Sequence, residues 1–240
     1  MSSGKKRLDI ALAQRGLVTT RSQAENYIKL GKVKVNGKIL NKSSILVSED
    51  DALEIKGEER YVSRAALKLE SVSHKLDLEF KGKLVLDVGS STGGFTDYAL
   101  QQGAQKVIAV DVGTDQLHPL LRDNPKIELH EKTDIRDFQP SEIPDFVVID
   151  VSFISLRQVL PHIADISSKN TQIVAMVKPQ FEAGVKDVHK GVIKNDTVRR
   201  QILKDFETWA KPLFRIENKA DSEVAGARGN RERFYLLKKH

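Results

Sequence analysis

The sequence predicts an α/β protein in which a large domain with a doubly wound, mostly parallel sheet follows a small α+β domain. Short apolar runs that are typical of buried strands recur through residues 68–240, and the segments between them are long enough for helical crossovers. Residues 1–57 instead contain two short helical patterns and a hairpin signal. Residues 58–67 are interpreted as a linker that runs into the start of a helix.

The small domain begins with two predicted helices. Apolar residues recur at helical spacing before Gly16, and Thr20 is placed to cap a second helix over residues 21–30. Valine and lysine then alternate up to Asn36-Gly37, which is the strongest short hairpin signal. Residues 52–55 add another strand, so a small sheet is expected beside the helices.

Positive charge is concentrated in this small domain. Residues 5–42 carry ten basic and two acidic side chains, a net charge of +8, whereas the whole chain has +6. Basic helices followed by a lysine-rich hairpin can lie along phosphates, although charge alone also fits a solvated basic surface. Tyr27 is the only aromatic residue of the domain, so binding is expected to depend on phosphates and shape more than on base identity.

The motifs Arg7-Leu8-Asp9, Thr20-Arg21 and Val33-Lys34-Val35-Asn36-Gly37 resemble the α-L RNA-binding motif. That motif occurs in a small-subunit ribosomal protein, in pseudouridine synthases and in a tyrosine tRNA synthetase. The resemblance implies that the basic residues of the domain contact RNA. They are Lys5, Lys6, Arg7, Arg15, Arg21, Lys29, Lys32, Lys34 and Lys38.

Composition excludes several classes of site. The absence of cysteine excludes disulfides, thiolate chemistry and cysteine zinc sites, and the six histidines show no metal-ligand spacing. No metal is therefore expected. No segment approaches the roughly 20 apolar residues that span a bilayer, so neither secretion nor membrane insertion is expected and a cytoplasmic location is favoured.

Seven strands are predicted in the large domain. The first five are residues 84–86, 107–110, 127–129, 146–149 and 173–177. Two more, over residues 214–217 and 233–237, follow a helix of about residues 197–209. No helical pattern separates these last two strands, so they are predicted to pair antiparallel in the arrangement typical of class I (Rossmann-like) methyltransferases.

A glycine-rich loop, Asp-Val-Gly-Ser-Ser-Thr-Gly-Gly-Phe, begins at Asp87, where the first of these strands ends. Glycines let a backbone pass close to a ligand, and doubly wound folds bind nucleotides at this end of the strands. The dinucleotide fingerprint is absent because it requires glycine at Ser91. Asp111 ends the second strand, where an acidic side chain can hold ribose hydroxyls. Asp134 is expected to end the third strand and accept a hydrogen bond from an adenine amino group, with Ile135 beneath the ring. A turn role for either carboxylate stays open.

The loop resembles the S-adenosylmethionine loop, Asp-x-Gly-x-x-x-Gly-Gly-Phe/Trp, of RNA ribose methyltransferases. This resemblance implies S-adenosyl-L-methionine as cofactor. The residues expected to bind it are Asp87, Gly89, Ser91, Gly93, Gly94, Phe95, Asp111, Asp134 and Ile135.

Four residues in separate motifs, Lys68, Asp150, Lys178 and Glu232, resemble the Lys-Asp-Lys-Glu tetrad of RNA ribose 2′-O-methyltransferases. A ribose hydroxyl is a weak acid, and a lysine accepts its proton only if burial or a neighbouring cation destabilises the ammonium. The resemblance implies that Lys178 is the proton acceptor, with Lys68 as the neighbouring cation. Asp150 would orient the lysine, while Lys68 and Glu232 would position the hydroxyl. Taken singly, a lysine at a strand end is usually a surface group.

These motifs together make nearly the whole chain similar to the hemolysin A (TlyA) family. The resemblance implies an enzyme that methylates the 2′-hydroxyl of cytidine in ribosomal RNA, with ribosomal RNA or ribosomal subunits as partners. Two other hypotheses are a membrane-lytic protein and a ribosome-assembly factor that binds RNA without catalysis. Residues 184–191 are interpreted either as a lid over RNA or as an ordinary exposed loop.

Overall fold

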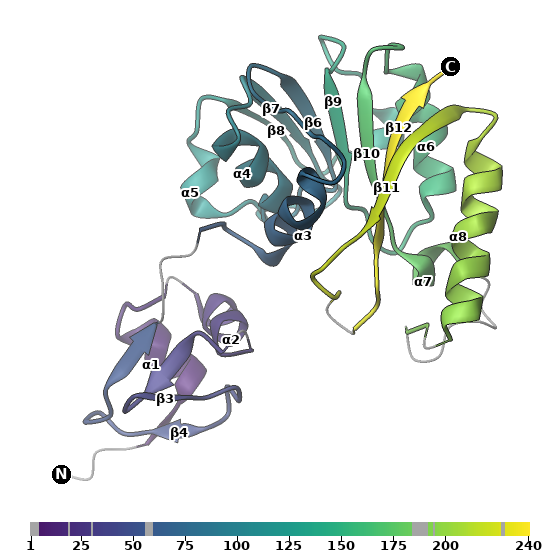
Figure 1. Ribbon diagram of the computed structural model, residues 1–240. Coiled ribbons are helices and arrows are strands. Elements are labelled where there is room, and N and C mark those ends of the chain that lie inside the picture. Colours follow the sequence, from purple (N-terminus) through teal and green to yellow (C-terminus); the bar gives the residue numbers. More distant parts are fainter. Residues whose placement is uncertain are drawn as a thin grey trace. The chain divides into compact units, whose positions relative to one another are not determined.

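The computed structural model describes residues 5–18, 20–29, 31–55, 60–183, 192–193, 195–226 and 229–240. The chain separates into two compact units, residues 1–60 and 61–240, and each is described by itself (Figure 1). The domain boundaries proposed from the sequence, at residues 57/58 and 67/68, stay predictions.

The N-terminal unit contains two helices, a three-stranded sheet in the order β3-β2-β5 and a two-stranded sheet of β1 and β4. Its helices and strands are β1 (Lys6–Arg7), α1 (Leu8–Gln14), α2 (Arg21–Lys29), β2 (Val33–Val35), β3 (Lys38–Ile39), β4 (Leu46–Val47) and β5 (Leu53–Ile55). Asn36 and Gly37 both have positive φ (50° and 77°), as the predicted hairpin requires. The Thr20 hydroxyl accepts a hydrogen bond from the Gln23 N–H at 3.1 Å, which confirms the predicted cap. The short antiparallel β1–β4 pair was not predicted.

The C-terminal unit contains a seven-stranded sheet, in the order β11-β12-β10-β9-β6-β7-β8. Its strands are β6 (Leu84–Val88), β7 (Lys106–Val110), β8 (Ile127–His130), β9 (Phe146–Ile149), β10 (Gln172–Val177), β11 (Phe214–Asp221) and β12 (Arg233–Lys239). Strands β6 to β10 are parallel, whereas β12 runs antiparallel to both β10 and β11. The predicted mostly parallel sheet and its antiparallel final strands are confirmed.

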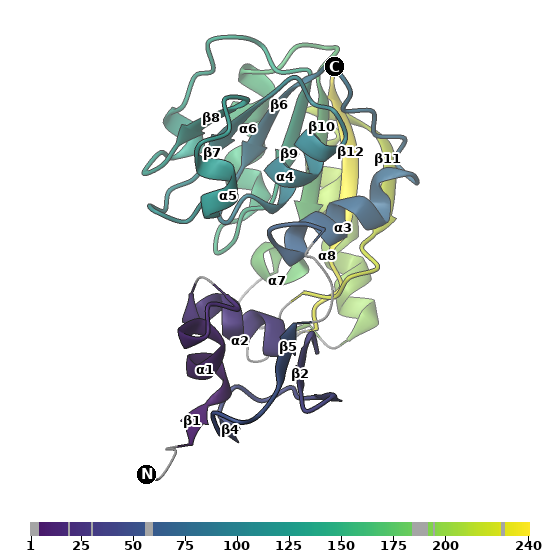
Figure 2. The ribbon, with the colours of Figure 1, turned by 90° about the vertical axis from the view of Figure 1, so that its left-hand side faces the viewer.

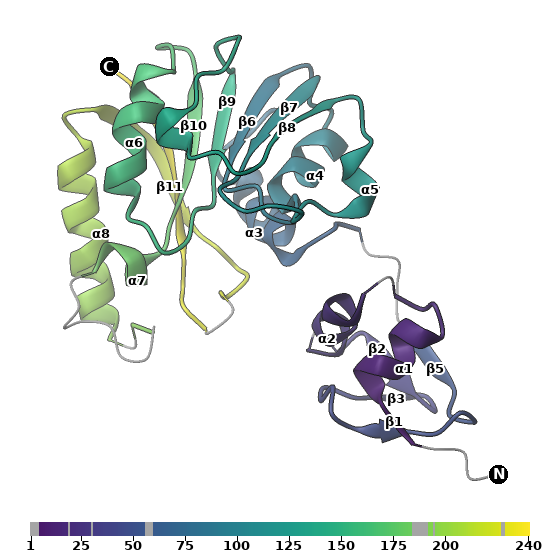
Figure 3. The same cartoon turned by 180° about the vertical axis from the view of Figure 1, so that it is seen from behind.

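Helices cover both faces of this sheet, as Figures 1 and 3 show from opposite sides and Figure 2 shows after a turn of 90°. In β9, Phe146 and Val148 pack against α3 and α4, while Val147 and Ile149 pack against α6 and α8. This alternation explains the continuous apolar runs in the sequence, because a strand buried on both faces needs apolar residues at every position. The helices are α3 (Arg64–Ser73), α4 (Gly94–Gln101), α5 (Pro119–Arg122), the 3₁₀ helix η1 (Ile135–Asp137), α6 (Leu156–Asp165), α7 (Pro179–Glu182) and α8 (Asp196–Ala210).

Three neighbouring strands place the candidate residues at one edge of the sheet. Parallel pairing aligns the carboxyl ends of β6, β9 and β10, after which Gly89, Asp150 and Lys178 follow. Val177 of β10 pairs with Arg233 of the antiparallel β12, so Glu232 lies at the same edge. Residues far apart in the chain therefore converge because of strand order and direction.

Candidate active and cofactor-binding site

Lys178 is held between two side chains of the loop that follows β9. Its Nζ lies 2.6 Å from Asp150 Oδ1 and donates a hydrogen bond to Ser152 Oγ at 2.7 Å. The Lys178 side chain is only 10% exposed, so its ammonium is largely removed from water and is compensated by one carboxylate. The proximity of Asp150 and Lys178 expected from adjacent strands is present in the structure.

Lys68 forms a second buried ion pair. It lies on α3, whose N-terminus is capped by the Ser63 hydroxyl accepting the Ala65 N–H, and its Nζ is 2.6 Å from Glu232 Oε2. The resemblance to the tetrad implies that Lys68 is a cation beside Lys178. The structure gives Lys68 its own carboxylate partner, so the four residues are arranged as two separate lysine–carboxylate pairs.

Two glycines of the loop after β6 are required by packing of the protein itself. Gly89 has φ 81°, and a Cβ there would lie 2.8 Å from the backbone oxygen of Asp150. A Cβ at Gly94 would overlap the Ser63 hydroxyl and approach Ala65 Cβ to 2.8 Å. From the sequence, these glycines are expected to let the backbone pass close to a ligand. In the structure, Gly89 also lets the loop approach the residue after β9, and Gly94 lets it approach the start of α3.

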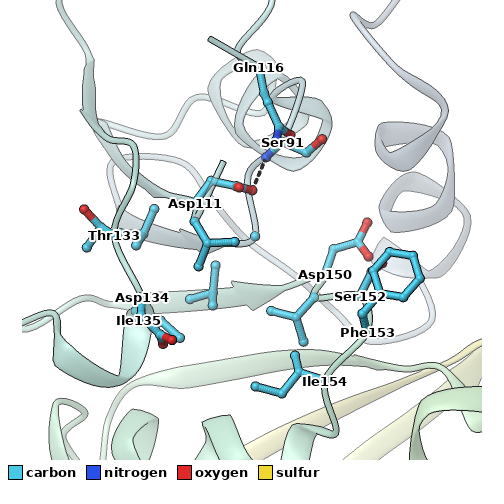
Figure 4. A pocket seen from close by; sticks show the side chains of 15 residues that line it. Ser91, Asp111, Gln116, Thr133, Asp134, Ile135, Asp150, Ser152, Phe153 and Ile154 are labelled. Carbon is cyan, nitrogen blue, oxygen red and sulfur yellow. Dashed lines mark hydrogen bonds between the residues drawn. The ribbon is translucent and has the colours of Figure 1, made fainter. Parts of the chain in front are cut away.

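Asp111 braces the glycine-rich loop. Its Oδ2 accepts the Ser91 N–H at 2.8 Å, marked in Figure 4, and its Oδ1 accepts the Gly113 N–H at 2.7 Å. It lines a cavity of about 340 Å³ at the carboxyl end of the sheet. In Figure 4, Asp134 and Ile135 lie on one side of Asp111 and Asp150 lies on the other. Five of the nine expected cofactor residues line this cavity, namely Gly89, Ser91, Asp111, Asp134 and Ile135.

Asp134 has a strong partner within its own turn. Arg136 Nε and Nη2 donate to its two carboxylate oxygens at 3.0 and 2.6 Å. These hydrogen bonds lower the pKa of Asp134 to about 2, so it stays ionised at neutral pH. It lies four residues beyond the end of β8 at His130 and caps η1. Its expected hydrogen bond from an adenine amino group stays a prediction.

Asp87 is completely buried, and only one of its two carboxylate oxygens has a hydrogen-bond partner. Its Oδ2 accepts the Thr96 hydroxyl at 2.6 Å, while Oδ1 and the neighbouring Ser90 Oγ have no partner. Burial raises the pKa of Asp87 to about 7 against the opposing Thr96 hydrogen bond, and the charge of Asp150 raises it further. Asp87 and Ser90 line a cavity of about 100 Å³. This cavity shares Gly89, Ser91 and Asp150 with the larger cavity.

Phe153 is a site residue that the sequence analysis missed. Its side chain is exposed (91%), its φ is 65°, and its ring centroid lies 5.3 Å from that of Phe181. Figure 4 shows it beside Asp150 and Ser152. An aromatic ring held in solvent with left-handed backbone geometry is unusual. Nothing in a single sequence distinguishes such a ring from a core phenylalanine.

The basic residues expected to bind RNA are not all equally available. Arg15 donates to the carbonyl oxygens of Ser48 and Asp51, at 2.7 Å each, and so supports a turn. Arg7 and Arg21 both hold the buried carboxylate of Asp9, whose pKa they lower. The other six residues are exposed or partly exposed: Lys5, Lys6, Lys29, Lys32, Lys34 and Lys38.

Two protein families match this chain, one over most of each unit. Residues 61–239 match the FtsJ-like methyltransferase model, and residues 6–53 match the S4 domain model. The chain belongs to the FtsJ-like methyltransferase family. It therefore combines a family methyltransferase domain with an N-terminal S4 domain, as the resemblance predicted.

Relatives within the family are similar over most of this chain. The chain is 43% identical to the 23S rRNA (cytidine-2′-O)-methyltransferase TlyA of Campylobacter jejuni, covering 84% of this chain and 79% of the relative. It is 37% identical to Hemolysin A of Brachyspira hyodysenteriae, covering 94% and 97%. A solved Streptococcus thermophilus protein, provisionally described as a hemolysin, has 37% identity and a TM-score of 0.77, covering 99% and 90%.

The described part of the chain shows neither a membrane-spanning helix nor a cluster of metal ligands. None of its helices is long and apolar enough to cross a membrane. It also contains no group of three or more His, Cys, Asp or Glu side chains arranged to hold a metal ion. Residues 184–191, interpreted from the sequence as either a lid over RNA or an exposed loop, lie outside the described residues.

Proposed function

We propose that this protein is an RNA ribose 2′-O-methyltransferase that uses S-adenosyl-L-methionine, and that its substrate is a cytidine in ribosomal RNA within the cytoplasm. The observation that carries the proposal is the buried Lys178–Asp150 pair, whose Asp150 lines two neighbouring cavities. Membership in the FtsJ-like family and relatives named as cytidine-2′-O-methyltransferases support the same reaction.

The cavities fit the proposed cofactor. Asp87 Oδ1 and Ser90 Oγ are buried polar atoms without partners at the small cavity, where an α-ammonium group would supply a donor. The larger cavity has an acidic side chain, Asp111, for ribose hydroxyls and an apolar one, Ile135, for an adenine ring. Asp150 lines both cavities, so it would border the cofactor between its amino-acid and nucleoside ends.

In the proposed mechanism, the chain aligns a hydroxyl and accepts its proton. Bound adenosylmethionine would supply an electrophilic methyl group on a sulfonium ion. As a neutral amine, Lys178 would point its two N–H bonds at Asp150 and Ser152, which leaves its nitrogen lone pair to accept the proton of the substrate hydroxyl. We assign Lys178 as proton acceptor. The Lys68–Glu232 pair would position the hydroxyl from the α3 side.

RNA would be held by both units. The exposed lysines of the S4 domain would contact phosphates, where affinity arises from counterion release. Phe153 would stack on the base of the target nucleotide, because its exposed ring lies near Asp150 and stacking on a ring is the usual way proteins hold an unstacked base.

The proposal is tested by methylation of ribosomal subunits from a strain that lacks this gene. Purified protein and tritiated adenosylmethionine should label the RNA, and mapping should place the methyl group on a cytidine ribose. Lys178→Ala protein is the control for contaminating activity. Label on a base, or equal label with the control, would refute the proposed reaction.

A further inference from the structure

Two short segments of the candidate site are connected at three successive points. The first segment is the loop of residues 150–156 and the second is residues 178–182, which begin with Lys178 and form α7. Lys178 contacts Asp150 and Ser152 at one end, as described above. The Phe181 ring contacts the Phe153 ring in the middle. The third connection, at the far end, is made by Glu182.

Glu182 binds the start of α6 with both carboxylate oxygens. Oε2 accepts the Ser155 hydroxyl at 2.6 Å, and Oε1 accepts the Leu156 N–H at 2.7 Å. Ser155 is itself the N-cap of α6, because its Oγ accepts the Arg157 N–H at 3.1 Å. A carboxylate is favoured here because the N-terminus of a helix carries partial positive charge.

The Glu182 carboxylate is buried and has a well-defined position. Its side chain is 2% exposed, and burial raises its pKa against the two hydrogen bonds. Arg157 Nε lies 3.6 Å from Oε2, and the Arg157 guanidinium lies over the Trp209 ring at 5.8 Å. A buried carboxylate that satisfies two converging donors restricts both segments to a single relative position.

The loop of residues 150–156 is held differently on its two sides. Val151 and Ile154 pack against the hydrophobic core below the sheet, and this packing holds them without Glu182. Ser152 and Phe153 are exposed, so their positions depend on contacts with Lys178 and α7. Loss of the Glu182 connection should therefore release the reactive side of the loop more than the side that packs on the core.

We propose that Glu182 is a positioning residue for methyl transfer, which fixes Ser152 and Phe153 relative to Lys178 by joining α7 to the N-terminus of α6. This inference rests on the proposed function. Glu182 acts through the loop and is not assigned any contact with the cofactor or the hydroxyl. A misplacement of about 1 Å in a catalytic group can reduce the rate about 100-fold, so a distant connection of this kind can matter for kcat.

The test compares Glu182→Ala and Glu182→Gln with the wild type. Glutamine keeps the side-chain length and can still accept the Leu156 N–H, but its NH₂ group cannot accept the Ser155 hydroxyl. We expect kcat to fall roughly 30-fold in Glu182→Ala and less in Glu182→Gln, with a raised KM for RNA. The Kd of S-adenosylhomocysteine should change less than about twofold, because Val151 and Ile154 remain packed on the core.

Glu142→Ala is the matched control, since Glu142 is an exposed glutamate outside the site and its removal should leave kcat, KM and Kd unchanged. Urea unfolding followed by the fluorescence of Trp209 shows whether each variant is folded. If Glu182→Ala does not fold, Glu182→Gln carries the test alone.

Coupling to Ser155 gives the decisive measurement. In a double-mutant cycle, Ser155→Ala should reduce kcat like Glu182→Gln, and the combined variant should lose little more than either single variant. Additive losses, a wild-type kcat in Glu182→Ala, or a cofactor Kd that weakens as much as kcat falls would overturn the positioning role. Absence of methylation by the wild type would overturn the proposed function and this inference with it.

Discussion

Replacing Asp87 with asparagine should make the stability of the methyltransferase unit less dependent on pH. Burial raises the pKa of Asp87 from 3.8 to about 7. Between these pH values the folded protein keeps a proton that the unfolded chain has released, so stability falls as pH rises, and the loss is complete above pH 7. The rise of about 3 in pKa, at about 1.4 kcal/mol for each pH unit, corresponds to about 4 kcal/mol in total.

Asparagine at residue 87 removes the charge but not the polar group. The Thr96 hydroxyl can still donate to the amide oxygen, whereas the amide NH₂ would occupy the position of Oδ1, which has no partner. An unsatisfied buried group costs about 1–3 kcal/mol at every pH. Asp87→Asn should therefore gain stability relative to the wild type between pH 5 and pH 8, and should be at least as stable as the wild type at pH 8.

The measurement is urea unfolding at pH 5 and pH 8, followed by tryptophan fluorescence. Trp209 is the single tryptophan of the chain and lies in α8, so the signal reports the C-terminal unit. Between the two pH values the difference in unfolding free energy between wild type and Asp87→Asn should change by about 3 kcal/mol, because titration of all other groups cancels. Parallel pH profiles for the two proteins would refute the assignment of a raised pKa to Asp87.

Three further predictions concern catalysis and RNA binding. Lys178→Ala should abolish methylation with Kd values for RNA and cofactor within about threefold of wild type, because a proton acceptor acts in the transition state. Lys178→Arg should also be inactive in single-turnover assays, since arginine does not release its proton near neutral pH; substantial activity would make Lys178 an electrostatic clamp. Phe153→Ala should lower kcat/KM for RNA by a factor that corresponds to about 1–3 kcal/mol, and Phe153→Tyr should keep kcat/KM near the wild-type value. A wild-type kcat/KM in the alanine variant would exclude base stacking. Lys29→Ala combined with Lys38→Ala should lower the magnitude of the salt-dependence slope of RNA binding by up to about 1.8, whereas an unchanged slope would mean that both lysines are only solvated.

The positions of the strands in the methyltransferase unit follow from local sequence patterns to a large extent. Each strand buried on both faces needs a continuous apolar run, and these runs identify β6 to β10 without any tertiary information. The antiparallel end of the sheet was predictable because no helical pattern separates residues 214–217 from 233–237. The resemblance of Lys68, Asp150, Lys178 and Glu232 to a known tetrad also predicted one site, whereas adjacent strand ends predicted only that Asp150 lies near Lys178.

Only the tertiary structure decided how those residues are paired and what supports them. Lys68 pairs with Glu232, and Glu182 holds the start of α6, so both contacts join segments that are distant in the chain. The burial that raises the pKa of Asp87 also depends on how distant segments pack around it. Phe153 likewise becomes a candidate contact only because its backbone turns its ring into solvent. Apolar periodicity indicates which residues are buried along one strand or helix. The partner of a buried charge depends instead on which atoms of different elements come close together, and tertiary packing alone determines this.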